Sequence, residues 1–137
     1  MSKTPGQLVR ELYESDFLND PEILHNYLHP EAELFWNAST GFSKMSFEDI
    51  SSMSSQMGKS FISLRASISH VVDDGKNVSI RLTYYVKTIE NPEEEVAIIH
   101  FIAIWEVKDG KLHKGYQISQ PSDEDPLNID AEYRIKS

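Results

Sequence analysis

Apolar and polar residues alternate in four runs between residues 61 and 120, and short polar connections separate these runs. Alternation with a period of two is typical of strands that bury one face. Asp74-Gly75 and Asp109-Gly110 are turn signals in two of the connections, and connections this short join antiparallel neighbours. The predicted strands span residues 61–72, 78–89, 96–107 and 112–120.

The front of the chain has the signals of three helices. Helix-capping residues lie at Thr4, Asp20 and Ser46, and a proline follows the first two, where it suits the first turn. We expect the second helix to end before Pro30 and the third to end at Gly58. The first helix carries an apolar stripe of Leu8, Val9, Leu12, Tyr13 and Phe17.

A short strand at residues 32–36 and a loop at residues 37–41 are predicted between the second and third helices. Helices that precede long antiparallel strands cover one face of the resulting sheet. We therefore predict an α+β fold, in which a cone-shaped, strongly curled antiparallel sheet wraps around N-terminal helices and encloses a pocket.

The predicted strand at residues 96–107 is apolar on both faces. Phe101 and Trp105 point to one side, and Ile102 and Ile104 point to the other. The helices can cover one face, so a symmetric second copy is expected to cover the other. We expect a homodimer through the outer sheet face, with a seam of Tyr85, Ile102, Ile104, Tyr116 and Ile118.

The composition fits one domain at residues 1–121, followed by a C-terminal tail at residues 122–137. The net charge of -9 argues against nucleic-acid and membrane partners, because an acidic surface repels phosphate groups. With no cysteine and no apolar targeting segment, we expect a cytoplasmic protein without disulfides. The tail is expected to pack on the cone or on the partner through Leu127, Ile129, Tyr133 and Ile135.

His25 and His29 are four residues apart, the spacing of two metal ligands on one helical face. A catalytic zinc site needs three protein ligands and a structural site four, and no third ligand lies at a recognisable spacing. We expect no metal and no other cofactor.

Five parts of the chain carry a recognisable pattern: Tyr13, Asp20–Leu24, Tyr27–Leu34, Val71–Val78 and Ile104–Leu112. In their order and spacing they resemble a nuclear transport factor 2-like, SnoaL-like domain (a cystatin-like fold). The resemblance covers about residues 7 to 120 and implies an α+β cone, a homodimer and a pocket between sheet and helices. Relatives include ketosteroid isomerase, polyketide cyclases, scytalone dehydratase, limonene epoxide hydrolase and non-catalytic modules, so the fold alone does not select a function.

The resemblance also indicates what is missing. Where the isomerase carries its base and its oxyanion-binding carboxylic acid, this chain has Trp36 and Ala103, and only Tyr13 matches the isomerase tyrosine. A proton shuttle without its base lacks the central group, so we predict that the chain is not a ketosteroid isomerase. The arginine between two acids that marks the epoxide hydrolases is not recognisable.

Two functions remain open. An apolar pocket with a few polar groups would bind or transform a small hydrophobic molecule. The alternative is a non-catalytic dimeric scaffold or protein-interaction module, in which the aromatic residues only fill the core. The candidate pocket-lining residues are Tyr13, Asp16, Trp36, Tyr84, Phe101, Trp105, His113 and Gln117.

Overall fold

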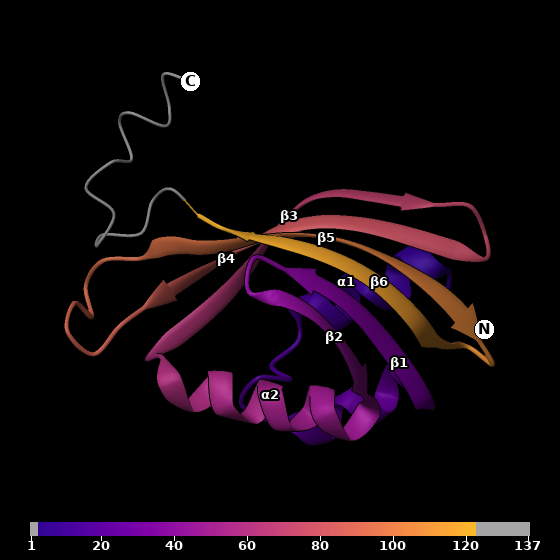
Figure 1. The fold of residues 1–137 in the computed structure, drawn as a ribbon, viewed down its shortest axis with the longest axis horizontal. Helices are drawn as coiled ribbons and strands as arrows, with labels where there is room; N and C mark the ends of the chain where they lie inside the picture. Colours follow the sequence, from indigo (N-terminus) through magenta and orange to yellow (C-terminus); the bar gives the residue numbers. More distant parts are fainter. Residues whose placement is uncertain (1–2, 123–137) are drawn as a thin grey trace.

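The computed structural model describes residues 3–122. In Figure 1 a strongly curled sheet lies above helix α2, and helix α1 is seen behind the strands. The elements are α1 (Pro5–Glu14), the 3-10 helix η1 (Pro21–Asn26), β1 (Leu28–Ala38), β2 (Gly41–Ser46), α2 (Phe47–Ser60), β3 (Ser63–Asp73), β4 (Asn77–Lys87), β5 (Val96–Lys108) and β6 (Lys111–Pro121).

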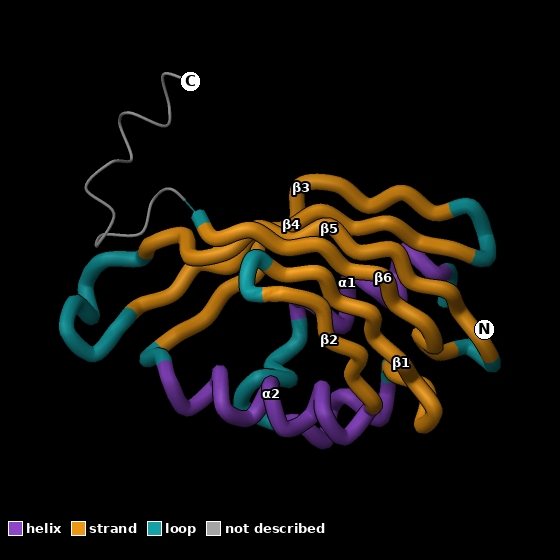
Figure 2. Tube along the Cα trace, viewed as in Figure 1, coloured by secondary structure: helices purple, strands orange, loops and turns teal. Residues whose placement is uncertain are grey.

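All six strands form one sheet with the order β2-β1-β6-β5-β4-β3. Neighbouring strands are antiparallel, except that β1 and β6 run parallel. The sheet curls over the helices without closing, since β2 and β3 form its two edges (Figure 2). The predicted α+β fold with N-terminal helices under a curled sheet is confirmed, whereas the parallel pair was not predicted.

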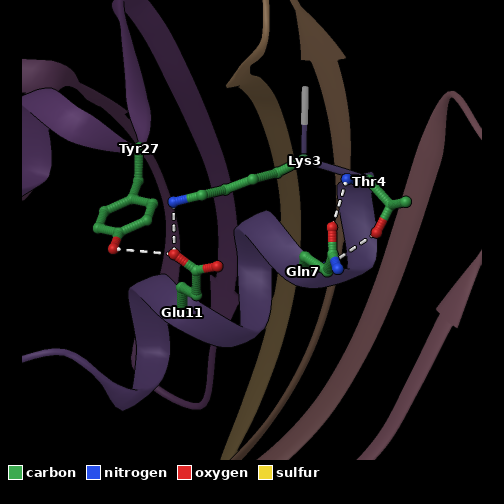
Figure 3. A network of polar contacts seen from close by, with 5 residues as sticks. All are labelled: Lys3, Thr4, Gln7, Glu11 and Tyr27. Carbon is green, nitrogen blue, oxygen red and sulfur yellow. Dashed lines mark hydrogen bonds and ion pairs between the residues drawn. The ribbon is translucent and has the colours of Figure 1, made fainter. Parts of the chain in front are cut away.

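Helix α1 begins with the predicted capping box (Figure 3). The backbone N–H of Gln7 donates to the Thr4 hydroxyl at 3.1 Å, and the Thr4 N–H donates to Oε1 of Gln7 at 3.0 Å. One turn later, the carboxylate of Glu11 accepts hydrogen bonds from Lys3 and from the Tyr27 hydroxyl. These contacts hold α1 beside the segment that leads into β1.

The second predicted helix is shorter than expected. Its 3-10 turn ends at Asn26, and β1 already begins at Leu28. Leu28 pairs with Leu112 of β6, so pairing in the sheet replaces helical geometry before Pro30 is reached. The expectation of a helical His29 was therefore wrong, and the spacing considered for a metal site does not exist on a helix.

Strand β2 was not predicted. Ser39 and Thr40 form a hairpin turn, and Gly41 follows with a φ of 128°, a conformation that glycine adopts without strain. The β2 side chains are almost all exposed, so the strand has no apolar alternation that a sequence pattern could reveal.

Helix α2 starts at the predicted Ser46 cap, with Asp49 completing the capping box. It does not stop at Gly58 but continues to Ser60. A Cβ atom at Gly58 would lie 1.9 Å from the carbonyl oxygen of Leu18. The glycine is thus needed for close packing of α2 against the loop after α1, not as a helix terminator.

The predicted faces of β5 are confirmed. Phe101, Ala103 and Trp105 are buried beneath the helices, whereas Ile102 is 52% and Ile104 is 44% exposed on the outer face. The same inward face continues onto β4 and β6, where it forms the core with the apolar sides of α1 and α2.

No helix within residues 3–122 is long and apolar enough to cross a membrane. The predicted packing of the tail concerns residues that lie outside the described part of the chain, apart from Ser122. The backbone N–H of Ser122 donates to the carbonyl of Ile98 at 2.9 Å and so continues the line of β6 by one residue.

Candidate functional site

A cavity of about 290 Å³ lies between the inner face of the sheet and the helices. Aromatic side chains from three strands form its sheet side, and mostly apolar side chains from α1, η1 and α2 form the opposite side. On the sheet side are Trp36, Tyr84, Phe101 and Trp105, and on the helical side are Leu12, Tyr13, Leu24, Ile50, Met53 and Met57.

Trp105 links the sheet to α1 at one end of the cavity. Its indole N–H donates to the hydroxyl oxygen of Tyr13 at 3.3 Å. Gly115 lies directly opposite Trp105 on β6, and a Cβ atom there would be 2.8 Å from the indole ring. The missing side chain at Gly115 therefore gives the indole the space that brings it to Tyr13.

Trp36 and Phe101 form the other end of the aromatic wall. The Trp36 indole N–H donates to the Ser119 hydroxyl at 2.8 Å, which leaves its ring face free to pack. The ring centres of Trp36 and Phe101 are 6.0 Å apart, and Tyr84 meets Phe101 edge to face at 5.5 Å. These contacts fix the orientation of the wall.

Gln117 is the polar residue of this wall. It is flanked on the sheet by Trp36 of β1 and by the small Ala103 of β5. The residue is only 6% exposed, and no residue within 3–122 donates to or accepts from its side-chain amide. No side-chain nitrogen or oxygen among residues 3–122 is both fully buried and unpaired, so the Gln117 amide is open to the cavity that it lines. A ligand in the cavity can therefore form a hydrogen bond with it.

The two tyrosines of the cavity keep their protons. Burial raises the pKa of Tyr13, although the hydrogen bond from Trp105 opposes this shift. Burial raises the pKa of Tyr84 well above its ordinary value, and the nearby Tyr13 adds to the increase. Since the Tyr13 oxygen already accepts from Trp105, its own O–H is available to donate to a ligand.

Within the described residues, no Asp, Glu, His, Lys or Arg lines the cavity. Ser54 lines it too, but its hydroxyl donates to the backbone carbonyl of Ile50 at 2.7 Å. No group of three or more His, Cys, Asp or Glu side chains in residues 3–122 is arranged to hold a metal ion. The polar groups open to a ligand are therefore uncharged.

The profile of the SnoaL-like domain family matches residues 9–114, which is well over half of the chain. The chain belongs to the SnoaL-like domain family. No curated protein sequence matches it.

Several solved structures have the same fold as this SnoaL-like domain. IdmH of Streptomyces antibioticus, a proposed polyketide cyclase, has a TM-score of 0.69 and 17% identity, covering 98% of this chain and 100% of its own. AclR of Streptomyces galilaeus, a proposed hydroxylase, has a TM-score of 0.70 and 14% identity, covering 92% and 83%. An epoxide hydrolase of M. tuberculosis has a TM-score of 0.62 and 16% identity, covering 85% and 84%. At these identities the likeness establishes the fold.

Six of the eight candidate residues line the cavity of the SnoaL-like domain, and two do not. Asp16 is exposed just after α1 and borders a separate, polar pocket. His113 lies at the start of β6, with its ring 4.9 Å from that of His29 and away from the cavity. The residues that line the cavity are Tyr13, Trp36, Tyr84, Phe101, Trp105 and Gln117.

Sequence reasoning did not assign α2 to the cavity. Ile50, Met53 and Met57 cover it, and their spacing had marked them as the apolar edge of a helix. That pattern reveals which side of the helix is buried but not that the buried side faces an open space.

Proposed function

We propose that this SnoaL-like domain binds a small, largely apolar molecule in the cavity, and that Gln117 hydrogen-bonds to a polar atom of this ligand. Family membership and fold support small-molecule binding or transformation as the general function. The observation that carries the specific proposal is the Gln117 amide, which is open to an apolar cavity and has no hydrogen-bond partner within residues 3–122.

We propose binding rather than proton abstraction, because no carboxylate or imidazole among the described residues borders the cavity. General acid–base catalysis needs a proton acceptor within hydrogen-bond reach of the substrate. Tyr13 and Gln117 offer hydrogen bonds that orient a ligand, and the raised pKa of Tyr13 keeps its hydroxyl a donor.

Intrinsic fluorescence provides a direct test, because both tryptophans of the chain line the cavity. Benzylacetone and butylbenzene have the same apolar body, but only the former has a carbonyl. We expect saturable changes in emission with both compounds, and an affinity about threefold to tenfold higher for benzylacetone, the value of one hydrogen bond.

The variant Gln117→Leu should remove the preference for benzylacetone and leave butylbenzene bound. Gln120→Leu, an exposed position near the end of the same strand, serves as the control and should keep the preference. A wild-type protein whose emission does not respond to either compound would contradict the proposal.

We also propose that the domain forms a homodimer through the outer face of the sheet. Supporting this are four apolar side chains that are 44% to 64% exposed in the single chain. Ile102 of β5 lies directly opposite Ile118 of β6, and Ile104 lies opposite Tyr116, so the four form one patch. Phe35 of β1 stacks on Tyr116 at 5.3 Å and extends the patch.

A further inference from the structure

We infer that the polar pocket beside the cavity is a binding site for an ammonium group, so that the ligand of this domain is an amine with an apolar body. This inference rests on the proposed function, since the apolar body would occupy the cavity. The pocket, called the vestibule below, has a volume of about 260 Å³. It is bordered by residues 13–16 at the end of α1, residues 64–66 of β3, Leu18 and Tyr84.

The vestibule adjoins the cavity. Tyr13, Leu18 and Tyr84 border both spaces. These three side chains lie between the two spaces, and the inference places the apolar body of the ligand in the cavity and its polar end in the vestibule. The apolar cavity and the polar vestibule together match a molecule with one apolar and one polar end.

Negative charge gathers at the vestibule. Glu14 is the last residue of α1 and Asp16 follows two residues later, while the last turn of α1 holds no basic residue. The carbonyl end of a helix carries a partial negative charge, so carboxylates at this end are unfavourable for stability. Residues that reduce stability are often found at functional sites. The two carboxylates at the end of α1 fit this rule, since together they attract a cation.

Two arginines lie near this charge without neutralising the vestibule. Arg65 borders it, but its guanidinium makes hydrogen bonds of 3.1 and 2.7 Å to Glu95 and stacks 4.6 Å from the Tyr85 ring. Arg10 is 3.9 Å from Glu14, and both side chains are about half exposed. A pair with this exposure is weak, so Glu14 can still attract a cation.

Tyr84 supplies the second, independent feature. It is only 5% exposed and borders the vestibule, yet no residue within 3–122 hydrogen-bonds to its hydroxyl. An ammonium group has three N–H donors, which a tyrosine oxygen and carboxylates can accept. Tyr13 also borders the vestibule, and an aromatic ring beside a cation adds to its attraction where the cation lies over the ring face.

The test compares three compounds that differ only in their end group: phenylbutylamine, phenylbutanol and phenylbutyrate. At neutral pH the first is a cation, the second is neutral and the third is an anion. Calorimetric titration of the full chain should give the amine an affinity about threefold to tenfold above that of the alcohol, with the carboxylate weakest. Added sodium chloride should reduce the preference, because the vestibule is open to solvent and salt screens exposed charges.

The double variant Glu14→Gln/Asp16→Asn should bring the amine and the alcohol to equal affinity. Glu90→Gln/Glu93→Gln removes the same charge from the exposed loop between β4 and β5, and it should keep the preference for the amine. Because carboxylates at a helix C-terminus are unfavourable, the vestibule variant should melt no lower than wild type. Should the double variant fold poorly, Glu14→Gln alone should show a reduced preference.

The outcomes separate this inference from the function on which it rests. If wild type binds the alcohol and the amine equally, or if the preference survives in the vestibule variant, the ammonium site is wrong and the apolar cavity site remains. If none of the three compounds binds, both proposals are wrong.

Discussion

The indole ring of Trp105 lies against Gly115 on the neighbouring strand, where a Cβ atom would come within 2.8 Å of three ring atoms. The absence of a side chain at Gly115 sets the position of the indole, and the indole N–H in turn holds the Tyr13 hydroxyl at 3.3 Å. One backbone position on β6 thus determines how a polar group of α1 is presented to the cavity.

Gly115→Ala should therefore displace the indole of Trp105. We expect a loss of about 1–3 kcal/mol in the free energy of unfolding, the usual cost of overpacking. Urea unfolding measures this loss, and a shift in tryptophan emission reports the ring movement. In a Trp105→Phe background the smaller ring leaves room, so the same glycine substitution should cost less. Equal costs in both backgrounds would contradict the contact.

Gly58→Ala should destabilise the protein although alanine is the better helix former. In an ordinary exposed helix the change would stabilise by about 1 kcal/mol. Here the new Cβ would lie 1.9 Å from the Leu18 carbonyl oxygen, so α2 must move away from the loop after α1. Urea unfolding should show a net loss of about 1–3 kcal/mol. Ser52→Ala, exposed on the same helix, should be neutral or slightly stabilising.

Stability should fall in alkaline solution because of Tyr84. Its pKa in the folded state is raised above 10.0, chiefly by burial, so the unfolded chain loses this proton first. Above the unfolded pKa the native state binds more protons than the unfolded state, and the free energy of unfolding decreases as pH rises. The stabilisation is complete below about pH 10 and is lost as pH climbs toward the folded pKa. Tyr13 contributes in the same direction.

Tyr84→Phe should reduce this alkaline loss. Its hydroxyl has no hydrogen-bond partner among residues 3–122, so the substitution should change stability little near neutral pH. Urea unfolding of wild type and variant at neutral and at alkaline pH measures the difference. An equal alkaline loss in both proteins would show that the titration of Tyr84 is not responsible.

Ile102→Glu/Ile104→Glu should convert the proposed homodimer into a monomer or an insoluble protein. Both side chains project from the outer face of the sheet, and a buried carboxylate in an apolar interface is strongly unfavourable. Light scattering at micromolar concentration gives the mass. Val72→Glu/Ile89→Glu adds the same charge at exposed positions outside this patch and should leave the mass unchanged. A monomeric wild type would contradict the proposal.

The sequence predicted those parts of the fold in which the local pattern of apolar and polar residues matches their burial in the structure. The alternation along β5 separated Phe101 and Trp105 from Ile102 and Ile104, because the helices bury one face of this strand. The Thr4 and Ser46 caps were recognised because the capping box needs only local residues. Six of the eight candidate residues line the cavity because single elements show which side faces inward: alternation does so for the five on strands, and the apolar stripe of α1 does so for Tyr13.

The remaining features depend on contacts between distant segments. Strand β2 is exposed and has no pattern of its own, and Leu28 joins β1 through a pairing with Leu112. The role of Gly58 depends on Leu18, forty positions earlier in the chain. That the Gln117 amide has no partner within residues 3–122 becomes visible only once its neighbours on β1 and β5 are known.

The parallel pairing of β1 with β6 governs when the cavity can assemble. Strand β6 is the last strand in the described chain, yet it lies in the interior of the sheet between β1 and β5. Trp36 meets Gln117 there, so the wall of the cavity joins residues that are synthesised far apart. Contacts of such long sequence separation slow folding, because the intervening chain must be ordered first. During synthesis on the ribosome, β1 and β5 must therefore wait with unpaired edges until the final strand emerges, a period in which chaperone binding or aggregation competes with folding.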